Sequence, residues 1–355
     1  MSILRKMKPN RTYLDWNASA PLRTEAREAM VAAFDVTGNP SSIHAEGRAA
    51  RAAVERARAQ VAKAAGAEAA DVVFVSGATE AAALCCAGRG LTCAIVEHEA
   101  VLAWCETALD VNGQGAVVVQ DPARSAVQVA NSETGVVQTL PEGLAVVDAT
   151  QALGKVPFAF DWSGAEMAFI SAHKIGGPKG VGAVFIRRGL DVAAAIKGGG
   201  QEMGRRAGTE NVAAIAGFGA AAEAAQADLD AGLWTAVAKR RDQLEDALRT
   251  AAPDLICVGQ GATRLPNTAL LVAPGWKGET QVMQMDLAGF AVSAGSACSS
   301  GKLRGSGTLT AMGFSPEDAG CALRVSLGPT TTDDDVGRFA EAWTRQWNKH
   351  RARAA

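Results

Sequence analysis

Short β-branched and apolar runs alternate with alanine-rich stretches of helical period as far as about residue 229. Because strands that alternate with helices pair side by side, this order predicts an α/β fold with a mainly parallel sheet covered by helices. The strands we expect are Val72–Ser76, Ala94–Glu97, Ala116–Val119, Val127–Asn131, Ala145–Asp148, Met167–Ser171 and Ala183–Arg187. The helices we expect are Thr24–Phe34, Ala45–Ala65, Thr79–Ala87, Val101–Leu109 and Asn211–Asp230.

The pattern changes after residue 229. A charged helical segment leads into two short strands, a Gly/Ser-rich loop and a terminal helix, which together predict a smaller α+β domain. We therefore expect a large domain over residues 23–228 and a small domain over 1–22 and 229–355. The segments concerned are Thr235–Arg249, Leu255–Val258, Asn267–Val272, Ser293–Gly307 and the helix from Thr332.

The connection from Asn131 to Ala145 is unusually short for a crossover between parallel strands, which needs a dozen or more residues and usually contains a helix. Pro141 and Gly143 lie within it. We expect a loop or a single turn in this connection and no regular helix.

Composition and charge exclude several classes of protein. The 355 residues are 48% hydrophobic and have a formal net charge of −2, and the arginine pairs are scattered, so nucleic acid is not an expected partner. The basic start lacks the apolar segment of a secretory signal, and no apolar run approaches the ~18 residues of a membrane span. Seven irregularly spaced cysteines do not resemble a disulfide framework, which favours a cytoplasmic protein.

Four predicted strands end in residues that suit one ligand. Small residues at Ser76–Glu80 begin a helix and could hold a phosphate, although Thr79 could simply cap that helix. Asp148 could cap a helix or pair with a protonated ring nitrogen. His98 and Lys174 follow two other strands, and the carboxyl ends of strands form the ligand crevice of an open α/β sheet.

A lysine amine held near other cations can attack an aldehyde, and Lys174 is followed by the glycine-rich stretch Ile175–Gly180. A surface lysine is the alternative reading. Together the phosphate turn, His, Asp and Lys suit pyridoxal phosphate (PLP), which needs an amine, a carboxylate and phosphate donors. No Walker motif and no Gly-x-Gly-x-x-Gly after a strand points to a nucleotide instead.

Two further residues are candidates for substrate chemistry. Cys298 lies among small residues, a setting that suits an exposed nucleophilic thiol better than core packing. Arg324 could hold a carboxylate with two hydrogen bonds. The alternatives are an ordinary loop cysteine and a surface ion pair. A zinc site from Cys85, Cys86, Cys93 and His98 matches no common ligand spacing, and Cys105, Cys257 and Cys321 lie in apolar surroundings typical of a core.

A series of ordered motifs resembles the cysteine desulfurases of the nitrogen-fixation and iron–sulfur-cluster type, which are PLP-dependent transferases of fold type I, the aspartate-aminotransferase fold. The motifs are Tyr13–Pro21, Gly38–Ser42, Ser76–Glu80, Asp148–Gln151, Ser171–Lys174, Arg206–Thr209 and Arg324–Gly328. The Ser-Ala-Cys-Ser-Ser sequence around Cys298 is similar to the group whose cysteine lies on a long mobile loop.

The resemblance implies a role for each matching position. It implies that Lys174 forms the Schiff base, Asp148 pairs with the pyridine nitrogen and His98 stacks on the ring. It implies that Gln151 contacts the phenolic oxygen. Phosphate contacts would come from Ala78, Thr79, Ser171 and His173, with Thr209 from the other subunit of a homodimer. Asn17 and Arg324 would orient the carboxylate of the substrate, L-cysteine, and Cys298 would receive its sulfur as a persulfide.

The chain departs from this family in two respects. The usual Asn-Asn-Glu-x-Gly is Asn131-Ser132-Glu133-Thr134-Gly135, so Ser132 replaces the asparagine expected beside the phenolic oxygen, and Asn131 could compensate. The segments Asp110–Asn131 and Val136–Leu144 look shorter than in the family, which suggests a trimmed scaffold and altered partner surfaces.

The resulting hypothesis is conversion of L-cysteine to L-alanine, with the sulfur of the Cys298 persulfide passed to an acceptor such as an iron–sulfur scaffold or a sulfur carrier protein. His98 would relay protons. Two alternatives stay open: a selenocysteine lyase or related β-eliminating enzyme, and a degenerate scaffold that binds cofactor weakly or not at all.

Overall fold

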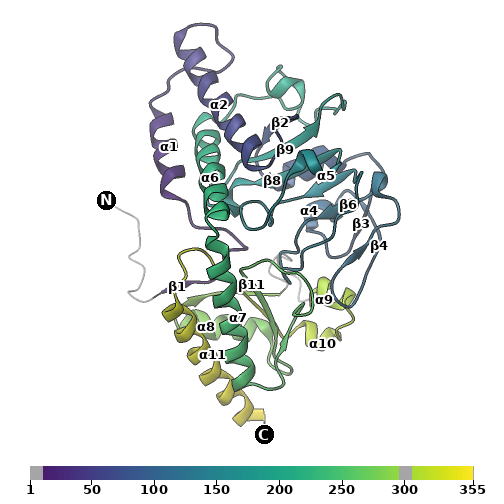
Figure 1. Cartoon of the computed structure of the whole chain (residues 1–355), viewed down its shortest axis with the longest axis vertical. Coiled ribbons are helices and arrows are strands. Elements are labelled where there is room, and N and C mark those ends of the chain that lie inside the picture. Colours follow the sequence, from purple (N-terminus) through teal and green to yellow (C-terminus); the bar gives the residue numbers. More distant parts are fainter. Residues whose placement is uncertain (1–10, 296–305, 355) are drawn as a thin grey trace.

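The computed structural model describes residues 11–295 and 306–354, and its largest sheet has five strands in the order β2-β9-β8-β7-β6 (Figure 1). Strands β6, β7 and β8 are parallel, whereas β9 is antiparallel to both of its neighbours. A bridge from Thr92 to Ser125 continues the parallel order through β3 to β4, which β5 joins. The bounds are β2 Ala70–Val75, β3 Thr92–Ala94, β4 Glu106–Val111, β5 Val117–Val118, β6 Ala126–Gln128, β7 Val146–Asp148, β8 Met167–Ser171 and β9 Gly182–Arg187.

Helices cover both faces of this sheet because successive strand residues point to opposite sides. Val72 and Phe74 lie in a core with α1 (Thr24–Phe34), α2 (Ala45–Ala64) and α6 (Val212–Asp230). Val73 and Val75 lie in a second core with α3 and α4. The helices on that face are α3 Ala78–Cys86 and α4 Glu99–Leu102, and the remaining short helices of this part are η1 Pro122–Arg124, α5 Phe160–Ser163, η2 Ala172–Lys174 and η3 Glu202–Gly204.

Glycines in α6 allow two helices to lie against it. A Cβ added at Gly217 would meet Met30 Cγ of α1 at 2.5 Å, and one added at Gly219 would meet Ala57 Cα of α2 at 2.7 Å. Both distances are shorter than any normal carbon–carbon contact. The glycines therefore set the packing distance of the α1, α2 and α6 layer (Figure 1).

A smaller antiparallel sheet, in the order β10-β11-β14-β13, forms a second unit with its own cores. Helices α7, α8 and α11 cover one face, and α9 and α10 cover the other. Strand β1 pairs with β12, so the amino-terminal segment joins this unit. The bounds are β1 Thr12–Tyr13, α7 Leu233–Ala251, β10 Ile256–Cys257, β11 Thr268–Val272, α8 Gly278–Leu287, β12 Phe290–Ala291, β13 Ser293–Ala294, α9 Gly307–Ala311, α10 Pro316–Ala319, β14 Ala322–Ser326 and α11 Asp333–Ala354.

Most predicted elements agree with the structure within a few residues, and Met167–Ser171 and Thr24–Phe34 have the expected bounds. The domain limits at residues 22/23 and 228/229 stay a prediction. The crossover from β6 to β7 has no helix, as predicted. Isolated β-bridges pair Ala130 with Val137 and Val136 with Arg264, so this connection contacts the second unit.

The predicted helix Val101–Leu109 is wrong. Helix α4 ends at Leu102, and β4 begins at Glu106. Leu109 and Val111 are half-buried while Asp110 between them is exposed, which is the two-residue period of a strand. A short apolar run is compatible with either period, and here pairing with β3 decides the outcome.

Among the residues that the structure describes, no helix has the length and apolar character needed to cross a membrane.

Candidate functional site

A cavity of about 550 Å³ opens at the carboxyl ends of the parallel strands of the large sheet. It brings together side chains from seven separate segments of the chain. Among the predicted site residues, those that line it are Asn17, Ala78, Thr79, His98, Ser132, Asp148, Gln151, Ser171, His173, Lys174 and Arg324. Thr209 does not line it, and Cys298 lies outside the described residues.

The amino-terminal end of α3 is one wall of the cavity. Gly77 precedes the helix with φ 154° and ψ −178°, a backbone region that glycine alone adopts readily. No side chain caps α3, so no side-chain acceptor covers the first-turn N–H groups at Ala78 and Thr79. These donors at the positive end of the helix dipole suit a phosphate.

Asp148 ends β7 with its carboxylate at the cavity. Burial raises its pKa, while a hydrogen bond from Thr150 and the nearby His98 and Lys174 oppose the rise. The backbone N–H of Thr150 donates to Asp148 Oδ1 over 2.8 Å, which holds the carboxylate in place. A half-buried carboxylate of this kind is well suited to a cationic ring N–H.

His98 caps α4, since its Nδ1 accepts a hydrogen bond from the N–H of Ala100 over 3.1 Å. An imidazole nitrogen that accepts carries no proton, so the neutral ring has its proton on Nε2. The cap therefore fixes the tautomer of a histidine that lines the cavity.

Lys174 lies in the 3₁₀ turn after β8, and its Nζ donates to the carbonyl oxygens of Asn17 at 2.6 Å and Ala18 at 3.1 Å. Burial and the neighbouring Lys174, Lys179 and Lys155 lower the pKa of His173 to about 4, so His173 is neutral at pH 7. The side of the cavity that holds the lysine amine is thus rich in cationic groups.

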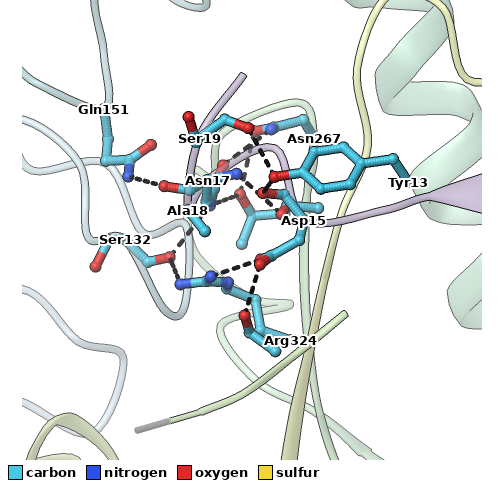
Figure 2. A network of polar contacts seen from close by, with 12 residues as sticks. Tyr13, Asp15, Asn17, Ala18, Ser19, Ser132, Gln151, Asn267 and Arg324 are labelled. Carbon is cyan, nitrogen blue, oxygen red and sulfur yellow. Dashed lines mark hydrogen bonds and ion pairs between the residues drawn. The ribbon is translucent and has the colours of Figure 1, made fainter. Parts of the chain in front are cut away.

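Arg324 lies on β14 and is only 2% exposed, which excludes a surface ion pair. Its Nη2 pairs with Asp15 Oδ1 at 2.8 Å, and its Nη1 donates to the Ser132 carbonyl at 3.1 Å (Figure 2). Its buried Nε–H has no partner among the described residues. A buried guanidinium that faces a cavity and has an N–H without a protein acceptor is well suited to an anionic ligand. Sequence reasoning missed Asp15, although it lies in the motif Tyr13–Pro21.

Asn17 is the centre of the polar network in Figure 2 and is 1% exposed. Its Nδ2 donates to Ser132 O at 3.1 Å and to Thr268 Oγ1 at 2.8 Å, so both amide hydrogens have partners. To orient a substrate carboxylate through its amide, Asn17 would have to give up one of them. Its role toward substrate stays a prediction.

The suggestion that Asn131 compensates for Ser132 is wrong. The Asn131 side chain is buried, with its Nδ2 on Val96 O and its Oδ1 accepting from the N–H groups of Glu133 and Thr134. Asn131 therefore stabilises its own turn and does not line the cavity. Ser132 does line it, and its hydroxyl is the group available there.

Thr209 is exposed and lies near a smaller hollow that also includes Ser76 and Gly180. Its loop is tied to the start of α3, because Arg206 Nε pairs with Glu80 Oε1 at 3.0 Å. Thr209 is thus close to the phosphate turn but outside the main cavity, and its contact with a partner subunit stays a prediction.

Glu133 is a carboxyl that sequence reasoning left unassigned. It accepts hydrogen bonds from Ser306 Oγ at 2.5 Å and Thr308 Oγ1 at 3.5 Å. Burial raises the pKa of Glu133 to about 7, against the opposing effects of Ser306, Arg324 and Thr308. Its position in the motif Asn131–Gly135 was the available signal.

We expect Glu133→Gln to remove part of the pH dependence of stability. The folded-state pKa lies above the unfolded value, so the stabilisation from the protonated form is complete below about pH 4.5 and is lost as the pH rises through about 7. The loss is on the order of 3 kcal/mol for a shift of this size. Urea unfolding of wild type and E133Q between pH 5 and 8 should show the variant gaining stability relative to wild type as the pH rises. Parallel curves would contradict this, and E25Q, at an exposed carboxyl of α1, is the control.

The cysteines of the described chain are free thiols. Cys85, Cys86, Cys93, Cys257 and Cys321 are buried, while Cys105 is half-buried at the edge of a core. Within residues 11–295 and 306–354, no three His, Cys, Asp or Glu side chains are grouped so that they could hold a metal ion.

The donor set of the cavity fits PLP. The α3 amino terminus would hold its phosphate, Asp148 its ring nitrogen and Lys174 its aldehyde carbon. The buried Nε–H of Arg324, without a protein partner among the described residues, fits the carboxylate of an amino-acid substrate.

Comparison with known proteins agrees with this geometry. The family model Aminotransferase class-V matches residues 12–339. Cysteine desulfurase IscS of Dictyoglomus turgidum is 37% identical, over 91% of this chain and 91% of the relative. A cysteine desulfurase of Cereibacter sphaeroides is 38% identical, over 93% of this chain and 94% of the relative. The solved structure of a NifS-like protein from Rickettsia africae matches with a TM-score of 0.86 at 29% identity, over 96% of this chain and 100% of that one.

The fold and the cavity are thus those of a PLP-dependent enzyme of fold type I. The chain belongs to the class-V aminotransferase family, and the curated relatives it resembles over nine-tenths of its length are cysteine desulfurases.

Proposed function

We propose that this chain is a PLP-dependent cysteine desulfurase that converts L-cysteine to L-alanine and retains the sulfur as a persulfide on Cys298. The observation that carries the proposal is that Lys174, Asp148, the α3 amino terminus and Arg324 line the same cavity, in a chain whose curated relatives are cysteine desulfurases. A solved structure titled "SspA in complex with cysteine" also matches, with a TM-score of 0.75 at 25% identity.

Each residue has a distinct task in this proposal. When bound, PLP withdraws electrons from the substrate Cα. Arg324 binds the substrate carboxylate, with its guanidinium held by Asp15. The Lys174 Nζ removes and returns the Cα proton, and Asp148 keeps a ring nitrogen protonated. His98, which carries its proton on Nε2, donates or accepts the second proton of the reaction.

The Cys298 thiolate attacks the substrate sulfur, so that a sulfur–sulfur bond forms as the carbon–sulfur bond breaks. The persulfide then passes its outer sulfur to an acceptor, which we propose is a protein of iron–sulfur cluster assembly or another sulfur-transfer pathway. We further propose a cytoplasmic homodimer in which Thr209 completes the phosphate site of the partner subunit.

The deciding experiment supplies L-cysteine and a thiol reductant to the purified protein. Equal amounts of alanine and sulfide are expected. A protein without visible cofactor absorbance would support the degenerate scaffold instead, and faster release of selenide from L-selenocysteine than of sulfide from L-cysteine would support the lyase.

A further inference from the structure

Lys155 is a buried amine beside the cavity to which neither the motifs nor the proposed function give a role. It is 4% exposed, in the turn segment that follows β7. Its Nζ donates to Gln151 Oε1 at 2.7 Å and approaches Asn17 Oδ1 at 3.4 Å. Burial, together with Lys174 and Arg324, lowers the pKa of Lys155 well below its usual range. Burial of an amine costs free energy, so we expect Lys155 to have a role that offsets this cost.

Lys155 and Asn17 together determine which way the Gln151 amide faces. The Asn17 carbonyl oxygen can only accept, so the group 2.9 Å from it must be the Gln151 Nε2 (Figure 2). The Lys155 N–H groups donate to the other end of the amide, Oε1. Since Gln151 lines the cavity, its second Nε2 hydrogen is available to an acceptor there.

The carbonyl that orients Gln151 also accepts from Lys174. Asn17 O takes a hydrogen bond from Lys174 Nζ at 2.6 Å as well as from Gln151 Nε2. Asn17 is itself held by Asn267, whose Nδ2 donates to Asn17 Oδ1 at 3.0 Å. Lys155 therefore belongs to a continuous hydrogen-bonded group that ends at the catalytic amine.

We propose that Lys155 is a positioning residue that holds the Gln151 amide with its N–H toward an anionic oxygen of the bound cofactor, the phenolic oxygen of PLP. The free N–H then stabilises the charge on that oxygen, while Lys155 prevents the amide from turning its own oxygen toward it. The inference needs the cofactor but not sulfur transfer, so a protein that binds PLP and releases no sulfide would refute the proposed function and leave this test intact.

The test is a pH titration of the visible absorbance of the PLP-loaded protein. That absorbance changes when the nitrogen joining Lys174 to the cofactor loses its proton. A donor to the neighbouring phenolic oxygen draws electrons from this nitrogen, so loss of the donor raises the midpoint. We expect Lys155→Met to raise the midpoint by about one pH unit. A shift of this size corresponds to the free energy of one hydrogen bond to a charged group. An unchanged midpoint would overturn the proposal.

A double-mutant comparison separates positioning from charge. Gln151→Leu should raise the midpoint by a similar amount, and adding K155M to Q151L should produce no further shift. If K155M still shifts the midpoint in the Q151L background, Lys155 acts through its charge and the proposal is wrong. Lys155→Arg, which keeps N–H donors at this position, should stay near the wild-type midpoint. Methionine fills the volume of lysine without a buried amine, and K155L, with the same expected shift, replaces K155M if that variant does not fold.

Discussion

Lys174→Ala is expected to abolish covalent attachment of PLP and to lower desulfuration at least ~10³-fold, since it removes both the amine that binds the aldehyde and the base that moves the Cα proton. Borohydride reduction followed by mass spectrometry measures attachment directly. In wild type, the added mass should be found on the peptide that contains Lys174.

Two other amines make this test specific. Lys179 lines the same cavity, and Lys155 lies buried behind it. Lys179→Ala should retain the attachment at Lys174, since only Lys174 follows β8 directly in the turn that faces Asn17. Reduced cofactor on Lys155 or Lys179 in the wild-type protein would refute the assignment of Lys174.

Cys298→Ser is expected to leave cofactor absorbance unchanged while sulfide release falls to background, a loss of ~10³-fold or more. A serine hydroxyl is almost never ionised at neutral pH and cannot form a stable persulfide, whereas a few per cent of an ordinary thiol is thiolate. After L-cysteine is added without reductant, the wild-type Cys298 peptide should gain the mass of one sulfur atom, and the C298S peptide should not.

Cys105 provides the matched control for this experiment. It is a half-buried thiol, and it does not line the cavity. Cys105→Ser should keep its turnover, and the Cys105 peptide should gain no sulfur. Turnover by C298S at the wild-type rate would show that the sulfur is taken up elsewhere.

The strand ends were predictable because each carries a local signal. Asp148 and Lys174 follow buried apolar runs, and parallel neighbours place such positions at one sheet edge. Helix α4 and strand β4 were not predictable, since an apolar run of this length fits both periods and only the pairing with β3 selects the strand.

The polar network behind the cavity was beyond sequence reasoning. Lys155 reads as an ordinary surface lysine after a turn, yet it is buried, and its Nζ contacts Asn17, more than a hundred residues earlier. Asn131 shows the opposite error: an amide next to Ser132 seemed able to replace a missing contact, but the backbone turn at Glu133 and Thr134 already uses it.

The order of residues along the chain by itself determined the alternation of strands and helices, the glycine turn before α3, and the positions of Asp148 and Lys174 at strand ends, because these depend on neighbours a few positions away. Only the tertiary structure decided how Asp15 holds Arg324, how Asn17 joins Gln151 to Lys174, and that Lys155 is buried. The contacts of Asp15 and Asn17 join segments more than a hundred residues apart, and exclusion of water from the folded interior strengthens them.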